Sequence, residues 1–192
     1  MKKIINEILL LPNLISSFRL LLFIPLIVLF NLMSGDDSYR YYILALIFIA
    51  FLSDILDGYV ARKTNQISEL GKIIDPIADK VLVVIIIFNL FITGMIPAYY
   101  FWVIVVRDLL ILLGGLAVKR KIGRVLPSNR LGKITVFSIG IFIILTLFQI
   151  DHITFLYKGV MFISLTLCFA SIIGYSVRAL EIINRKKNES SL

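Results

Sequence analysis

The sequence contains a single cysteine, Cys168, and a single histidine, His152, among its 192 residues. One cysteine excludes an internal disulfide and a cysteine-based metal site. His152 stands in a short polar gap between two apolar runs, so we interpret it as a solvated loop residue rather than a catalytic base. Charged residues are also scarce, at 17% against 59% hydrophobic residues. A soluble domain with so few polar groups could not cover its surface, and the composition therefore predicts a membrane protein.

Six apolar runs are each long enough to cross the hydrocarbon core of a bilayer, which takes about 20 residues. They cover residues 14–33, 40–61, 76–93, 97–118, 134–150 and 153–177. Residues 2–10 place apolar side chains on one helical face and polar ones on the other, as in a helix that lies in the membrane interface. Residues 180–192 form a polar tail. We predict one all-α integral membrane domain over residues 1–192, with six transmembrane helices and an N-terminal interfacial amphipathic helix.

The basic residues are unevenly distributed along these runs. If the N-terminus is cytosolic, 15 of the 20 lysines and arginines fall in cytosolic segments, whereas only Arg40 and Lys158 fall on the opposite face. This bias predicts that both termini are cytosolic in a multi-pass protein of the cell's inner (cytoplasmic) membrane. The formal charge of +8 is then explained by attraction to anionic lipid headgroups, and no nucleic-acid partner is expected.

Four aspartates stand at the ends of the second and third apolar runs: Asp54, Asp57, Asp75 and Asp79. A carboxylate within a span costs about 2.5 kcal/mol or more on insertion scales. The spacings i, i+3 and i, i+4 place each pair on one helical face. Because the segment 62–74 reverses the chain, we expect the pairs to meet near the cytosolic boundary. Oxygen donors without thiolate or imidazole suit Mg²⁺ or Mn²⁺, and two such ions could clamp a phosphoryl group.

Two other interpretations of the aspartates are open on these residues. In the first, the carboxylates are only salt-bridged to Arg62 or Lys80, although two bases cannot neutralise four acids. In the second, they line a cation or proton pathway in a transporter. A transporter needs access from both sides of the membrane, whereas all four aspartates lie toward one face. The enzyme is therefore favoured, and the transporter is the alternative from another functional class.

The segments around the aspartates also match a known pattern. Residues 54–62 read DILDGYVAR and, after eight residues, residues 71–79 read GKIIDPIAD. Together they match every fixed position of D-x2-D-G-x2-A-R-x8-G-x3-D-x3-D, the signature of the CDP-alcohol phosphatidyltransferase family. Residues 12–19, PNLISSFR, resemble the opening P-N-x-x-S/T-x-x-R of bacterial members, and residues 131–135, LGKIT, resemble their L-G-K-x-x-T segment. The resemblance covers most of the chain.

This resemblance implies that a phosphatidyl group moves from CDP-diacylglycerol to an alcohol, with release of CMP, in phospholipid biosynthesis at the cytosolic face. It implies that Asp54, Asp57 and Asp75 bind two Mg²⁺ or Mn²⁺ ions, and that Asp79 completes the metal site and acts as the catalytic base. The residues implied to bind CDP-diacylglycerol are Asn13, Ser16, Asp57, Gly58, Ala61, Arg62 and Gly71. The family also has six spans and an N-terminal interfacial helix, and it implies a homodimer.

Arg107 and Lys133 are the candidates for binding the acceptor alcohol. Two cations beside the metal site would suit a phosphorylated acceptor such as sn-glycerol 3-phosphate. Both positions resemble acceptor-site residues of bacterial phosphatidylglycerophosphate synthases, the branch of the family that the chain is most like. Arg107 could instead be compensated by Asp108, and Lys133 could snorkel from a span end.

The acceptor itself stays open between several alcohols. Gly115 stands where those synthases usually have a second arginine, and the Arg-Asp pair at 107–108 also occurs in cardiolipin synthases of the family. Phosphatidylglycerol and an inositol phosphate are therefore alternative acceptors.

Overall fold

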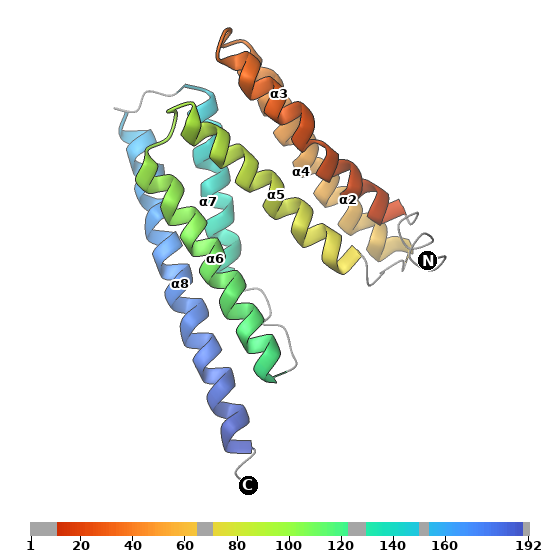
Figure 1. Ribbon diagram of the computed structural model, residues 1–192, viewed down its shortest axis with the longest axis vertical. Helices are drawn as coiled ribbons and strands as arrows, with labels where there is room; N and C mark the ends of the chain where they lie inside the picture. The colour runs from red at the N-terminus through yellow and green to blue at the C-terminus, as the bar shows by residue number, and fades with distance from the viewer. Residues whose placement is uncertain (1–10, 65–70, 123–129, 150–153, 190–192) are drawn as a thin grey trace. The chain divides into compact units, whose positions relative to one another are not determined.

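The computed structural model describes residues 11–64, 71–122, 130–149 and 154–189, with side chains described at 13–60, 63, 80–115, 118, 130–149 and 154–181. Every regular element in these ranges is an α-helix, which confirms the all-α prediction (Figure 1). The helices are α2 (Leu11–Leu21), α3 (Phe23–Met33), α4 (Tyr39–Thr64), α5 (Gly71–Ile92), α6 (Ala98–Ile122), α7 (Arg130–Leu147) and α8 (Phe155–Glu189). The predicted interfacial helix at 2–10 lies outside the described residues.

Five helical stretches in the described residues are long and apolar enough to cross a membrane. They are Asn13–Met33, Tyr39–Val60, Ala98–Gly115, Arg130–Leu147 and Phe155–Glu181. The predicted span at 76–93 falls in α5, whose apolar part with described side chains, Lys80–Ile92, is shorter. The 22 residues of α5 would still extend about 33 Å. The membrane character of the chain is thus confirmed, while the count of six spans stays a prediction.

The first predicted span is built from two helices in line. The break lies at Leu22, whose N–H is shared between the carbonyls of Phe18, at 3.2 Å, and Arg19, at 3.1 Å. Pro25 follows three residues later and has no N–H to donate to the carbonyl of Leu21. The missing hydrogen bond explains why the helix is irregular here, and Figure 1 shows α3 continuing the direction of α2.

Two of the turns that the structure describes, before α4 and after α5, are short and have recognisable caps. Before α4, the N–H of Ser38 donates to Asp36 Oδ1 at 2.8 Å, a contact that lowers the pKa of the Asp36 carboxyl. After α5, Gly94 has a φ of +72°, and the N–H of Met95 donates to the carbonyl of Leu90 at 2.9 Å. Such a left-handed glycine ends many helices.

The helices form two compact units, which divide after Met95. In the first unit, α2 and α3 each pack against both α4 and α5. The sequence predicted that α4 and α5 are direct neighbours. In the structure, the closely packed pairs of helices join α4 to α2 and α3, and join α5 to the same two helices. The buried apolar residues of this unit include Leu22, Leu26, Phe30, Ile43, Leu82, Ile86 and Leu90. The N-terminal helices therefore form the centre of the unit.

In the second unit, α8 packs against both α6 and α7. Its interior contains Tyr100, Phe142 and Tyr157, with ring centroids 4.2 and 4.9 Å apart in succession. The hydroxyls of Tyr100 and Ser164 lie 2.9 Å apart and share a hydrogen bond. Small hydroxyl residues let membrane helices approach closely and bond across the interface. Many large apolar side chains in both units are exposed, Phe137 and Phe162 among them, as expected of helices that face lipid.

Candidate active site

In the first unit, one arginine of α2 bridges both aspartates of α4. Arg19 Nη1 donates to Asp54 Oδ1 at 3.0 Å, and Arg19 Nη2 forms an ion pair with Asp57 Oδ2. Ser16 Oγ donates to the same Asp57 oxygen at 3.0 Å. The two carboxylates therefore converge on a single cationic group, as their i, i+3 spacing on one helical face predicts.

The α2 residues of this site form a polar stripe that faces inward. Asn13, Ser16 and Arg19 recur every three residues, and all three are buried, with at most 2% of their surface exposed. Leu14 and Phe18, on the other side of the same helix, are exposed. This helix thus reverses the pattern of a water-soluble amphipathic helix, because its apolar side faces lipid and its polar side faces α4.

The two aspartates differ in their exposure. The side chain of Asp57 is 7% exposed, whereas that of Asp54 is 51% exposed. Gly58, which follows Asp57, is half-buried. Two carboxylates and one guanidinium give these three side chains a formal charge of −1. A further cation can approach from the side of Asp54, because its carboxylate is the more exposed of the two.

The remaining predicted site residues of this unit lie on helical segments whose side chains are outside the described set. Ala61 and Arg62 belong to the last turns of α4, while Gly71, Asp75 and Asp79 belong to the first turns of α5. Asp75 and Asp79 are one helical turn apart on α5, which packs against α2. The meeting of the two aspartate pairs stays a prediction.

The donor set of Asp54 and Asp57 fits a hard divalent cation. Both carboxylates already contact one cationic group, the Arg19 guanidinium, and the hydroxyl of Ser16 is a further oxygen ligand beside Asp57. Oxygen ligands of this kind suit Mg²⁺ and Mn²⁺, whereas thiolate and imidazole ligands would favour zinc. A metal would need more ligands than this pair supplies, and Asp75 and Asp79 are the predicted ones.

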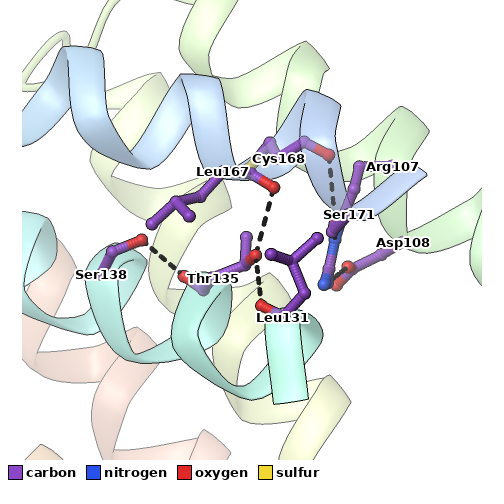
Figure 2. Close-up of polar contacts among 8 residues, drawn as sticks. All are labelled: Arg107, Asp108, Leu131, Thr135, Ser138, Leu167, Cys168 and Ser171. Atoms are coloured by element: carbon purple, nitrogen blue, oxygen red, sulfur yellow. Dashed lines mark hydrogen bonds and ion pairs between the residues drawn. The ribbon is translucent and has the colours of Figure 1, made fainter. Parts of the chain in front are cut away.

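In the second unit, Arg107 is buried between α6, α7 and α8 (Figure 2). Its Nε donates to Ser171 Oγ at 3.0 Å, and its Nη1 pairs with Asp108. Figure 2 shows Thr135 of α7 beside this group, where its hydroxyl donates to the carbonyls of Leu131, at 2.8 Å, and Leu167, at 3.2 Å. Compensation of Arg107 by Asp108, one of the two sequence interpretations, is thus present.

Lys133 differs from Arg107 in that its side chain is exposed. It follows Gly132, where α7 lies close to side chains of the other two helices. A Cβ on Gly132 would lie 3.2 Å from Tyr175 Cε2 and Oη, and 3.7 Å from Arg107 Nη2. The Arg107 guanidinium and the Tyr175 phenol therefore both reach the N-terminal turn of α7.

We expect Gly132→Leu to lower the melting temperature of the protein, because the new side chain must displace Tyr175 and Arg107. Overpacking of this kind costs about 1–3 kcal/mol. Gly140→Leu is the matched control on the same helix, since a Cβ on Gly140 meets nothing within 4 Å. Thermal unfolding of the two purified variants compares them. A Gly132→Leu variant as stable as Gly140→Leu would show that the approach of α7 is looser than the structure has it.

The chain belongs to the CDP-alcohol phosphatidyltransferase family, whose model matches residues 9–171. A CDP-diacylglycerol–glycerol-3-phosphate 3-phosphatidyltransferase of Aquifex aeolicus is 31% identical over 180 residues, covering 90% of this chain and 97% of the relative. The Bacillus subtilis protein of the same name is 36% identical over 135 residues, covering 65% and 69%. A rat cardiolipin synthase (CMP-forming) is 39% identical over 83 residues, covering 43% and 26%.

The predicted family is thereby confirmed, and with it a membrane enzyme of phospholipid synthesis rather than an ion transporter. The matched segment includes both aspartate pairs and the polar stripe of α2. Sequence reasoning missed Arg19 as a member of the site, although Arg19 fills the last fixed position of the motif at residues 12–19. Its position three residues after Ser16 was the available signal.

Proposed function

We propose that the protein transfers the phosphatidyl group of CDP-diacylglycerol to sn-glycerol 3-phosphate and releases CMP. The observation that carries the proposal is the convergence of Asp54 and Asp57 on one cationic group, within a segment that matches the family signature at every fixed position. Two relatives that are named for this reaction match over most of their own length, 97% and 69%. The cardiolipin synthase matches over 26% of its length, which favours glycerol 3-phosphate over phosphatidylglycerol as the acceptor.

In this proposal Asp54, Asp57, Asp75 and Asp79 hold two Mg²⁺ or Mn²⁺ ions. When bound, the ions supply positive charge that stabilises the diphosphate and the leaving CMP. The donor nucleotide is held by Asn13, Ser16, Asp57, Gly58, Ala61, Arg62 and Gly71. Asn13 and Ser16 line the same buried face of α2 that contacts Asp57, which supports their assignment to the donor site.

The transfer is a displacement at the phosphatidyl phosphorus. The acceptor hydroxyl oxygen forms a bond to this phosphorus while the bond to the bridging diphosphate oxygen breaks, and CMP leaves with that oxygen. Asp79 takes the proton of the acceptor hydroxyl, as a carboxylate of suitable pKa can do. The chain offers no competing histidine on the cytosolic side, because His152 lies in a gap that is predicted to face outward.

Arg107 and Lys133 are proposed to bind the acceptor phosphate. The buried Arg107 is held in place by Ser171 and Asp108, and an oriented guanidinium of this kind recognises phosphate well. The exposed Lys133 would add a mobile charge on the neighbouring helix. We further propose that the chain has six spans and forms a homodimer, as the resemblance to the family implies. The distribution of basic residues predicts that the site faces the cytosol from the inner membrane.

An acceptor panel tests the proposed function. Purified protein with CDP-diacylglycerol and Mg²⁺ or Mn²⁺ is expected to release CMP in the presence of glycerol 3-phosphate, at rates well above those with phosphatidylglycerol or inositol phosphate. Chelation of the metal by EDTA should stop the release, and added Mg²⁺ should restore it. CMP release with phosphatidylglycerol alone would instead make the protein a cardiolipin synthase, and silence with every alcohol from a folded protein would refute the transferase.

A further inference from the structure

We propose that Arg19 is a built-in counter-ion of the metal site, which holds Asp54 and Asp57 together when no metal is bound and competes with the metal for their carboxylates. The inference rests on the proposed function, because it takes these two aspartates as metal ligands. It adds Arg19 as a residue that sets the affinity of the site for metal.

The geometry of Arg19 is that of a substitute cation. One planar guanidinium contacts Asp54 Oδ1 with one terminal nitrogen and Asp57 Oδ2 with the other. A divalent ion that bridges the two residues would bind these same carboxylates. Arg19 itself is only 1% exposed, and Ser16 from the preceding turn of α2 donates to the same Asp57 oxygen. The arginine is thus held in a fixed position between α2 and α4.

The charges explain why a substitute is needed. Asp54 and Asp57 are two like charges one helical turn apart, near lipid, where an uncompensated carboxylate is costly. Arg19 neutralises one of the two negative charges and leaves the pair with a residual attraction for cations. Arg19 contacts one oxygen of each carboxylate. A divalent ion that arrives at the pair therefore shares these carboxylates with the guanidinium or displaces it, and in either case it meets the repulsion of a fixed positive charge. Arg19 therefore stabilises the metal-free protein and weakens metal binding.

Two substitutions separate this role from a purely structural one. Arg19→Gln removes the charge and keeps a hydrogen-bonding group, while Arg19→Lys keeps the charge but loses the planar fork that bridges two carboxylates. Loss of a merely structural contact would weaken metal binding or leave it unchanged. Loss of a competing cation strengthens it, so the direction of the change decides the question.

The experiment is a Mn²⁺ titration of the full-length protein in lipid nanodiscs without substrate, with free Mn²⁺ followed by its electron paramagnetic resonance signal. Arg19→Gln is expected to bind Mn²⁺ about tenfold more tightly than the native protein, a change equivalent to about 1.4 kcal/mol. Arg19→Lys is expected to lie between the two. Thermal unfolding should show a lower melting temperature for Arg19→Gln without metal and a larger increase on addition of Mn²⁺.

Arg40→Gln is the control, because it removes one positive charge from the first turn of α4, where the arginine contacts Tyr41. Its Mn²⁺ affinity should equal that of the native protein. Equal or weaker Mn²⁺ binding by Arg19→Gln would overturn the inference; if that variant does not fold, the same result with Arg19→Lys overturns it. A native protein that neither binds Mn²⁺ nor releases CMP would refute the proposed function instead, so the two failures are distinguishable.

Discussion

Replacing Asp79 with asparagine is expected to abolish most CMP release while CDP-diacylglycerol still binds. Asparagine has nearly the shape of aspartate but cannot accept the proton of the acceptor hydroxyl. A positioned general base contributes about 10²–10⁴-fold to a rate, and the loss should be at least of this size because Asp79 also completes the proposed metal site. The measurement is CMP release at saturating glycerol 3-phosphate, with binding of CDP-diacylglycerol measured separately.

Asp37→Asn is a suitable control for Asp79→Asn. It removes the same charge from an exposed position in the turn between α3 and α4, and we expect native turnover. Normal turnover in Asp79→Asn would show that the base is another residue. A variant that loses donor binding as well as turnover would assign Asp79 to the metal and donor site alone.

The second large effect is expected at Asp57. Asp57→Asn should lose both Mn²⁺ binding and CMP release, and its melting temperature without metal should decrease. The Asp57 side chain is 7% exposed and pairs with the buried Arg19. Breaking a buried pair from one side costs about 3–5 kcal/mol when the remaining charge has no other partner, and the cost here is smaller because Arg19 keeps its contact with Asp54. The amide oxygen of the introduced asparagine could still accept a hydrogen bond from Ser16, so the lost charge is the main cause.

Asp54→Asn is the matched comparison, since it removes the other carboxylate of the same pair. The Asp54 side chain is 51% exposed, and an exposed pair contributes about 0–1 kcal/mol. We therefore expect Asp54→Asn to lose activity and metal binding with little change in melting temperature. Equal destabilisation by the two variants would contradict the different burial of the two carboxylates, and full activity in either would remove that residue from the metal site.

Much of the fold could be predicted because a helix that crosses a lipid bilayer needs a run of about 20 apolar residues. The apolar runs at 40–61 and 97–118 correspond closely to spans in α4 and α6. The division of the first run into α2 and α3 follows from Pro25, whose missing N–H was visible in the sequence. Which helices pack together was less accessible. The direct pairing of α4 with α5 was inferred from their order in the chain, whereas α2 and α3 pack against both of them.

In the candidate site, contacts between residues close in sequence could be predicted, whereas contacts between distant residues could not. The spacing of Asp54 and Asp57 predicts their shared face without any knowledge of the other helices. Arg19 is 35 residues from Asp54, and only the rotation of α2 about its axis decides whether it faces α4 or lipid. Ser171 is the partner of Arg107 at a separation of 64 residues, and no sequence signal pointed to it, whereas Asp108 is adjacent to Arg107 and was predicted as its partner.

The ion pairs of Arg19 also bear on how the chain enters the membrane. The ribosome produces Arg19 before Asp54 and Asp57, its partners 35 and 38 residues later. During that interval the first hydrophobic segment carries a positive charge that is costly in lipid. We therefore expect α4 to strengthen the integration of this segment, with the two entering the bilayer as a hairpin. Truncated chains that end before residue 54 should integrate less completely than chains that include α4.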